Sequence, residues 1–277
     1  MNKKLIFLDI DGTLTEPGKN IPPESAVEAV EMARRAGHKV FLCTGRNYGM
    51  LKPLLKYGFD GLIASSGGYI EVEKKVIYDH PMTKEQEQRA MDVLAQNQIF
   101  CTIECRDGSY TDERLKDFLR DNQDKSENSE LLRWREQIEQ SLGIRPMSEY
   151  KGQPLYKIVM MALSRESLEN AKKILGKDFA FCIQETKGHT IHNGELICTD
   201  YDKGQAVERV CSYLGYTVKD TIGFGDSMND LEMMEMVGIS VCMQNGSNAL
   251  KNIADYVCPP YYENGIYEAF QRYQLLI

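Results

Sequence analysis

The chain lacks the features that mark fibrous, disordered and membrane-spanning proteins. Only nine of its 277 residues are proline, and no internal repeat or low-complexity segment is present, which argues against a collagen-like or disordered chain. No apolar run is long enough for a membrane-spanning helix. The N-terminal run Leu5–Leu8 is ended by Asp9 and Asp11, too early for a secretory signal. We therefore expect a globular protein with no membrane partner.

Positive charge is also scarce. The 33 lysine and arginine residues are outnumbered by 41 aspartate and glutamate residues, which gives a net charge of -8 at pH 7. Such a chain repels the phosphate backbone of nucleic acids and the surface of anionic membranes. Nucleic acid is therefore not an expected partner, and composition leaves the oligomeric state open.

Cysteine is present but not in metal-binding or disulfide patterns. None of the eight cysteines forms a Cys-x-x-Cys pair, and Cys43 and Cys242 lie in apolar runs. Cys101 and Cys105 have no second ligand pair nearby, which makes zinc a poor interpretation. Buried, reduced thiols in a cytoplasmic protein are the favoured interpretation.

Strand and helix patterns alternate at both ends of the chain. Short apolar runs predict buried strands, and the segment Pro22–Ser25 is typical of a helix start. This alternation indicates an α/β fold with a doubly wound, Rossmann-like parallel sheet. The predicted strands are Leu5–Leu8, Lys39–Cys43, Gly61–Ala64, Thr221–Phe224 and Ile239–Met243, and helices are predicted at Gln205–Leu214 and Leu231–Met236.

The middle of the chain has a different pattern, which predicts an α+β cap domain inserted at residues 82–194 into a core formed by residues 1–81 and 195–277. A hairpin is expected just before it, at Tyr69–Tyr78. Within the insertion the predicted elements are helices at Thr83–Gln96, Thr111–Arg120 and Arg165–Leu175, strands at Ile99–Glu104, Tyr156–Leu163 and Ala180–Gln184, and an exposed polar segment at Asp121–Glu130.

Acidic residues follow two of the predicted strands. Asp9-Ile10-Asp11-Gly12-Thr13 comes after the first strand, and Gly225-Asp226-Ser227-Met228-Asn229-Asp230 comes after the strand at Thr221–Phe224. Ligands gather beyond the carboxyl ends of strands in open α/β sheets. Carboxylates there are costly unless a cation or hydrogen bonds accept them. Helix capping by Asp226 or Ser227 is the competing explanation for the second cluster.

Two further clusters suit an anion. Thr44-Gly45-Arg46 follows the second strand, where a hydroxyl and backbone N–H groups can bind phosphate. Lys203 follows Asp202 at a predicted helix start, a place where a lysine opposes the helix dipole, and a phosphate would explain it. Capping by Thr44 and a solvated surface position for Lys203 are the simpler alternatives.

Together these segments resemble the haloacid dehalogenase-like hydrolase superfamily, specifically its Cof-type subfamily IIB with a large α/β cap. Asp9–Leu14 is similar to the first family motif, Thr44-Gly45-Arg46 to the second, Lys203-Gly204 to the third and Gly225–Asp230 to the fourth. The segments Met243–Gly246 and Glu263–Ile266 are similar to the closing segments of the subfamily.

The resemblance implies a phosphatase that hydrolyses phosphomonoesters of small metabolites, such as sugar phosphates, through an aspartyl-phosphate. Asp9 would be the nucleophile and Asp11 the general acid and base, with Thr13 fixing Asp11 by a hydrogen bond or stabilising the turn. Mg²⁺ would be held by Asp9, the Asp11 carbonyl and Asp226. Phosphate would be held by Thr44, Gly45 and Lys203, and Asn229 or Asp230 would orient Lys203 or the water ligands of the metal.

The chain departs from the family at two positions. Ser66-Gly67-Gly68 stands where the family often has Asn-Gly-Ala, and Tyr201 stands two residues before the motif lysine, where a serine is usual. Substrate contacts are therefore not transferred from the family. His189 and His192 are candidate substrate contacts, with core or exposed positions as the simpler reading. A phosphomutase or phosphotransferase, or a non-catalytic metabolite-binding protein, remain alternatives.

Overall fold

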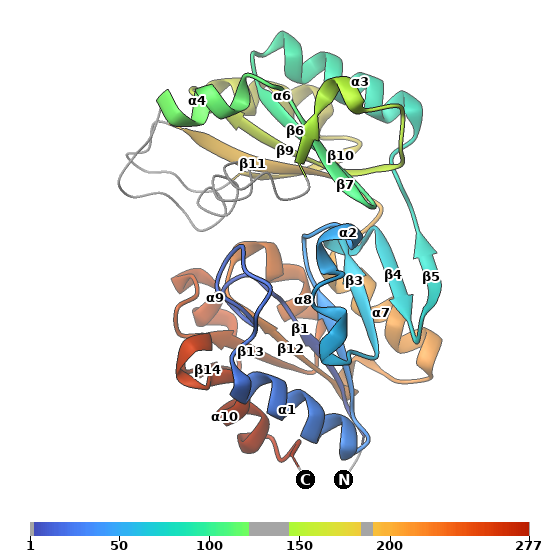
Figure 1. Cartoon of the computed structure of the whole chain (residues 1–277), viewed down its shortest axis with the longest axis vertical. Helices are drawn as coiled ribbons and strands as arrows, with labels where there is room; N and C mark the ends of the chain where they lie inside the picture. The colour runs from blue at the N-terminus through green and yellow to red at the C-terminus, as the bar shows by residue number, and fades with distance from the viewer. Residues whose placement is uncertain (1–2, 122–143, 184–190, 277) are drawn as a thin grey trace. The chain divides into compact units, whose positions relative to one another are not determined.

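The computed structural model describes residues 3–121, 144–183 and 191–276. Contacts divide the chain into two compact units. The first contains Met1–Arg46, Leu51–Asp79 and Tyr201–Ile277, and the second contains Asn47–Met50 and His80–Asp200. Each unit has its own sheet (Figure 1). No helix among these described residues is long and apolar enough to cross a membrane.

The first unit is built on an eight-stranded sheet with the order β14-β13-β12-β1-β2-β3-β4-β5. Its strands from β14 to β3 pair in parallel, and β4 and β5 form an antiparallel hairpin at the edge. This confirms the predicted α/β class with a parallel-sheet core. The strands are β1 (Leu5–Leu8), β2 (Lys39–Cys43), β3 (Gly61–Ala64), β4 (Tyr69–Val72), β5 (Lys75–Asp79), β12 (Thr221–Gly225), β13 (Ile239–Met243) and β14 (Tyr256–Cys258).

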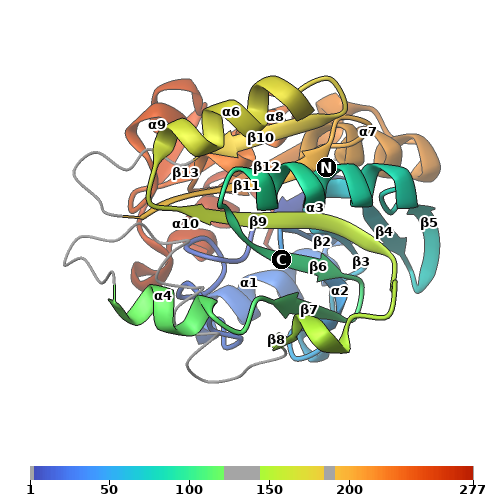
Figure 2. The same cartoon turned by 90° about the horizontal axis from the view of Figure 1, so that it is seen from above.

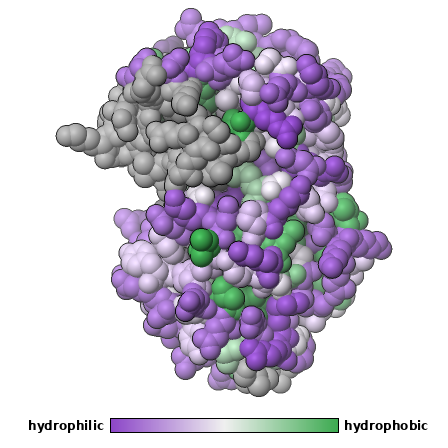
Figure 3. Space-filling view, viewed as in Figure 1, coloured by the Kyte–Doolittle hydropathy of each residue, from purple (hydrophilic) through white to green (hydrophobic). Residues whose placement is uncertain are grey.

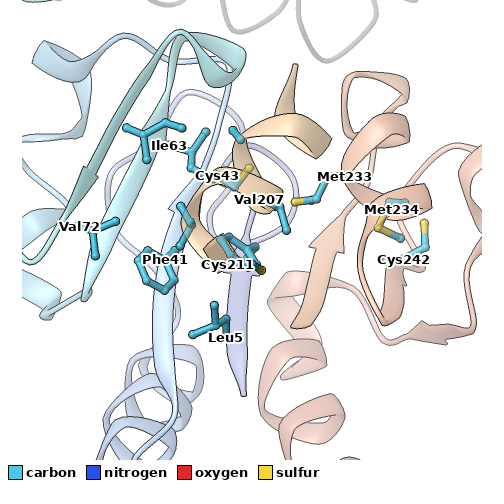
Figure 4. Close-up of a cluster of buried hydrophobic side chains, with 14 of the residues drawn as sticks. Leu5, Phe41, Cys43, Ile63, Val72, Val207, Cys211, Met233, Met234 and Cys242 are labelled. Carbon is cyan, nitrogen blue, oxygen red and sulfur yellow. The ribbon is translucent and has the colours of Figure 1, made fainter. Parts of the chain in front are cut away.

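Helices cover both faces of this sheet because neighbouring strand residues point to opposite sides. On one side, strand residues such as Leu5, Phe41 and Ile63 pack with Val207 and Met233 from the helices (Figure 4). On the other side Phe224 lies against Phe270, with ring centroids 5.4 Å apart. The helices of the first unit are α1 (Glu24–Arg35), α7 (Lys203–Leu214), α8 (Leu231–Met236), α9 (Asn248–Ile253) and α10 (Gly265–Arg272), and most of the short helix α2 (Tyr48–Leu51) belongs to the second unit.

The second unit contains a six-stranded sheet with the order β10-β11-β9-β6-β7-β8, antiparallel except for the β7–β8 pair. Helices α3 and α6 lie along one face of it (Figure 2). Its elements are α3 (Lys84–Gln96), β6 (Phe100–Cys105), β7 (Gly108–Thr111), α4 (Leu115–Asp121), β8 (Ile144–Pro146), β9 (Leu155–Ala162), α6 (Arg165–Leu175), β10 (Phe179–Ile183) and β11 (His192–Cys198).

The elements of the second unit differ in part from those that the sequence predicts. The helix expected at Thr111–Arg120 is wrong at its start, because Thr111 ends β7 and Asp112 accepts a hydrogen bond from the Arg114 amide at 2.9 Å. Strand β11 was not expected, and it extends across the predicted insertion limit at residue 194. Most of the polar segment Asp121–Glu130 lies outside the described residues.

A buried ionic cluster lies on adjacent strands of the second sheet. Lys157 on β9 is fully buried, and its Nζ lies 2.6 Å from Glu195 on β11 and 3.3 Å from Glu104 on β6. Buried charges need such partners because removal from water is costly. The cluster therefore ties the three central strands to one register.

On the face drawn in Figure 3, the coloured surface is mainly hydrophilic, with hydrophobic side chains in small patches. All eight cysteines are free, and most are buried, as their apolar surroundings predicted. Burial raises the pKa of Cys43 above its usual range and that of Cys242 to about 12. These thiols are therefore protonated and belong to the packing of the core.

Candidate active site

Two acidic residues meet at the edge of the first sheet where β1 and β12 end. The two strands pair in parallel with Leu8 opposite Phe224, and the Asp9 amide donates to the Phe224 carbonyl at 3.0 Å. Asp9 follows β1 directly and Asp226 follows β12. Both are buried, with exposed fractions of 4% and 7%. The parallel register thus brings together carboxylates that lie more than two hundred residues apart in sequence.

Asp230 completes an acidic cluster with these two residues. One carboxylate oxygen from each of Asp9, Asp226 and Asp230 lies within 4.8 Å of the others. Burial and the neighbouring Asp230 charge raise the pKa of Asp9 to about 8, and burial and Asp9 raise the pKa of Asp226 well above its usual range. Carboxylate oxygens at this spacing are the donor set that hard divalent cations prefer. The cluster therefore fits a divalent metal ion.

Lys203 at the start of α7 is the counter-charge of this cluster. Its Nζ donates to Asp9 Oδ1 at 2.7 Å and to Asp230 Oδ1 at 2.6 Å, and the residue is 1% exposed. Burial alone would lower the pKa of Lys203, but the Asp230 and Asp9 carboxylates raise it well above its ordinary value. The alternative of a solvated surface lysine is therefore wrong, and the ammonium ion is held beside Asp9.

Asp230 is held in place by the turn that carries Asp226. Its Oδ2 accepts hydrogen bonds from the Asp226 and Ser227 amides at 3.0 and 3.1 Å, while its Oδ1 accepts from Lys203. A Cβ atom at Gly225 would lie 2.7 Å from the Asp230 side chain, so glycine is required there. The helix-capping interpretation is confirmed for Ser227, which is the N-cap of this turn and forms a capping box with Asp230. Asp230 also accepts a hydrogen bond from Lys203.

Asn229 lies beside this turn and is half-buried. Its Oδ1 accepts a hydrogen bond from the Ser227 hydroxyl at 2.7 Å. The hydrogen bond from Lys203 is accepted by Asp230 rather than by Asn229. Of the two residues expected to orient Lys203, the geometry therefore favours Asp230.

Asp226 lies close to Gly12 and Thr13 of the first motif. Gly12 has a φ of +86°, and a Cβ atom there would lie 2.5 Å from Asp226 Oδ2. The Thr13 hydroxyl donates to Asp226 Oδ1 at 3.1 Å. The expected hydrogen bond from Thr13 to Asp11 is therefore wrong, because the single hydroxyl proton is used on Asp226.

Thr44 and Gly45 follow β2 at the same sheet edge, since Leu8 of β1 pairs with Leu42 of β2. Both residues are buried. The Thr44 hydroxyl accepts a hydrogen bond from the Arg46 amide at 3.1 Å, so its own proton is directed elsewhere. The hydroxyl can therefore donate to an anion, which is the property that phosphate binding requires.

Two further polar residues contact the first motif, although the sequence alone assigns a role to neither of them. Arg46 is 1% exposed and donates to both carboxylate oxygens of Asp11, from Nη2 at 2.6 Å and from Nε at 2.7 Å. Asn245 donates from its side-chain amide to the Gly12 carbonyl at 2.7 Å. Both lie in the quoted motif segments, but only the fold shows that they contact the Asp9–Thr13 loop.

The two histidines proposed as substrate contacts are not part of this cluster. His192 is half-buried on β11 of the second unit. His189 lies outside the described residues. Neither residue gains a functional assignment from the structure.

Comparison with known proteins places the chain in a family. A family model described as haloacid dehalogenase-like hydrolase matches residues 6–270. The Bacillus subtilis protein YkrA is 28% identical over 282 residues, which cover 100% of both chains. The 5-amino-6-(5-phospho-D-ribitylamino)uracil phosphatase YwtE of Bacillus subtilis is 28% identical over 284 residues and 95% of each chain.

Solved structures share the fold. The sugar phosphatase BT4131, described as a member of HAD subclass IIB, superposes with a TM-score of 0.77 at 21% identity, over 99% of this chain and 100% of that one. The phosphatase BT1666 from Bacteroides thetaiotaomicron superposes with a TM-score of 0.80 at 18% identity, over 99% and 96% of the two chains. Because the family model spans nearly the whole sequence, the chain belongs to the haloacid dehalogenase-like hydrolases.

Proposed function

We propose that the protein is a Mg²⁺-dependent phosphatase that hydrolyses phosphomonoesters of small metabolites through an aspartyl-phosphate on Asp9. The observation that carries this proposal is the single buried cluster in which the Asp9 carboxylate lies against Lys203 and within 4.8 Å of Asp226 and Asp230 oxygens. A carboxylate nucleophile divides phosphoester hydrolysis into two displacements. Proposals for the individual residues follow from the same geometry.

The divalent cation would be held by Asp9 and Asp226, with the Asp11 main-chain carbonyl as a further oxygen donor. When bound, Mg²⁺ supplies the positive charge that lets an anionic nucleophile approach an anionic phosphate. Asp230 would orient Lys203 rather than bind the cation, because both of its carboxylate oxygens already accept hydrogen bonds. The raised pKa values of Asp9 and Asp226 are consistent with this assignment, because buried acids without a cation favour the protonated form.

The chain's own residues then perform the two steps. In the first, an Asp9 oxygen attacks phosphorus, the phosphorus–oxygen ester bond breaks, and Asp11 gives a proton to the departing alkoxide. In the second, Asp11 takes a proton from water, the water oxygen attacks phosphorus, and inorganic phosphate leaves Asp9. Lys203, the Thr44 hydroxyl and the Gly45 N–H would stabilise the charge on the transferring oxygens.

The substrate proposal rests on the relatives and on the inserted unit. One relative is named for a phosphorylated ribityl compound, and one structural neighbour is named a sugar phosphatase. Both names concern polyhydroxylated phosphomonoesters. We therefore infer that sugar phosphates and related polyol phosphates are the substrate class, and that the insertion predicted at residues 82–194 recognises their organic part.

Phosphate release from a panel of sugar and polyol phosphates tests the proposal. We expect release with Mg²⁺, loss of release in EDTA and recovery on adding Mg²⁺ back. Asp9→Asn should lose turnover by at least about 100-fold, whereas Asp60→Asn, which removes a carboxylate paired with Arg34 on the same unit, should keep it. Isomerised sugar phosphate without free phosphate would indicate a mutase, and binding without turnover would indicate a non-catalytic protein.

A further inference from the structure

Arg46 makes an unusually complete set of contacts for a buried arginine. Besides its two bonds to Asp11, Nη1 donates to Asn20 Oδ1 at 2.7 Å and Nη2 donates to the Lys19 carbonyl at 2.9 Å. A guanidinium in a planar, two-point contact with a carboxylate has little freedom to turn. The buried positive charge of Arg46 therefore has specific hydrogen-bond partners, and among these Asp11 carries the negative charge.

Asp11 is fixed from two directions. Its Oδ1 accepts from the Gly18 amide at 2.7 Å as well as from Arg46 Nη2, while Oδ2 accepts from Arg46 Nε. The side chain of Asp11 is 11% exposed. The carboxylate is thus held between the segment that follows β2 and the loop that follows β1.

The main chain of Arg46 is anchored separately from its side chain. Its amide donates to the Thr44 hydroxyl, and its carbonyl accepts from the Ser65 amide at 2.8 Å. Neither of these two hydrogen bonds involves the guanidinium group. The loss of the guanidinium can therefore be studied with little change in the path of the Thr44-Gly45-Arg46 backbone.

We propose that Arg46 is a positioning residue for proton transfer by Asp11. The inference rests on the proposed function, in which Asp11 donates a proton to the leaving alcohol and later accepts one from water. A carboxylate fixed at both oxygens presents a defined geometry to its partners, and misplacement by about 1 Å can cost about 100-fold in rate. Arg46 acts on the reaction only through Asp11.

A purely structural role for Arg46 makes a different prediction. A residue that merely stabilises the fold lowers the amount of active enzyme and slows all substrates equally. A residue that positions a general acid matters most when the leaving group needs a proton, as an alkoxide does. Nitrophenolate leaves readily without one, so its release reports attack by Asp9 with little help from Asp11.

The test compares first-turnover rates of Arg46→Met with two substrates, p-nitrophenyl phosphate and an alkyl phosphate that the wild type hydrolyses. We expect nitrophenolate release in the first turnover to stay within about threefold of wild type, and alkyl phosphate cleavage to fall about 100-fold. Arg46→Lys keeps the charge without the two-point contact and should recover part of the loss. Equal losses on both substrates would overturn the proposal.

A double variant checks that the effect passes through Asp11. Asp11→Asn with Arg46→Met should be no slower than Asp11→Asn alone, within about threefold, on the alkyl phosphate. A clearly slower double variant would show that Arg46 has another role. Arg34→Met is the matched control, because Arg34 makes a similar two-point contact with Asp60 away from the cluster, at 3.0 and 3.1 Å.

Two further measurements distinguish a folding defect from a loss of function. Thermal unfolding establishes that each variant is folded, and if Arg46→Met is not, Arg46→Lys carries the same comparison of substrates with the same expected direction. A wild-type enzyme that releases phosphate from neither substrate refutes the proposed function. A wild type that hydrolyses both, with no selective loss in the Arg46 variants, refutes only the role of Arg46.

Discussion

The acidic cluster should make the metal-free protein less stable as pH rises, and Asp9→Asn should relieve this effect. Burial raises the pKa of Asp9 from 3.8 to about 8, so between these values the folded state holds a proton that the unfolded chain has lost. The unfolding free energy contributed by this group therefore falls as pH increases through that interval and is constant above it. Asparagine carries no charge and lacks this dependence.

The size of the effect follows from the pKa. Each pH unit within the interval changes the unfolding free energy by about 1.4 kcal/mol for one proton. From pH 5 to pH 8 the upper bound is about 4 kcal/mol, and loss of the Lys203 contact in the variant offsets part of the gain. We expect the difference in unfolding free energy between Asp9→Asn and wild type to increase by about 2–4 kcal/mol over this range.

Urea unfolding in EDTA at pH 5, 6, 7 and 8 measures this difference directly. Asp60→Asn is the control, because Asp60 forms an ion pair with Arg34 at 3.0 Å outside the cluster, and its difference from wild type should be nearly independent of pH. Added Mg²⁺ should stabilise the wild type at pH 8 by mass action and have little effect on Asp9→Asn. A pH-independent difference for Asp9→Asn would refute the reasoning.

Three other substitutions probe separate contacts. Lys203→Met leaves two buried carboxylates without their cation, so we expect at least a 100-fold loss of phosphate release and about 3–5 kcal/mol of destabilisation at pH 8, measured by urea unfolding. Thr13→Val removes the hydrogen bond to Asp226 and should cost about 1 kcal/mol and raise the Mg²⁺ concentration needed for half-maximal activity. Phe41→Ala empties a fully buried site stacked on Phe7 at 5.2 Å and should cost about 3–5 kcal/mol without changing the KM of the enzyme that remains folded.

The parallel sheet could be predicted closely because its strands are short apolar runs between polar segments. The predicted bounds of Leu5–Leu8, Gly61–Ala64 and Ile239–Met243 are the observed ones. Nearly every residue of these strands is buried, so a short run of hydrophobic residues marks the limits of each strand. The hairpin at the β5 edge was also predicted, whereas the short strand β14 at the other edge was not.

Strand β11 shows why the inserted unit was harder to predict. Its sequence from His192 to Cys198 contains Asn193, Gly194 and Glu195, residues that are depleted in strands. Asn193 and Glu195 are nevertheless buried, and Glu195 is paired with Lys157 of the neighbouring strand. That pairing depends on tertiary contacts, which local sequence patterns do not record.

The residues of the candidate site could be predicted from the sequence, but several of their contacts could not. Asp9, Asp226 and Lys203 were predicted from motifs, and the structure brings all three together. The partner of Thr13 could not be predicted, since it depends on how closely Asp226 approaches Gly12. The contact of Arg46 with Asp11 could not be predicted from the sequence either, because it joins two loops whose separation only the fold defines.

Rapid acid quenching of the wild-type enzyme during turnover, followed by peptide mapping, tests the central claim most directly. The account predicts a phosphoryl group on Asp9, in larger amount when Asp11→Asn slows its hydrolysis, and none in Asp9→Asn. Full-rate phosphate release with no phosphoryl group on Asp9, or with the group on another residue, would contradict it.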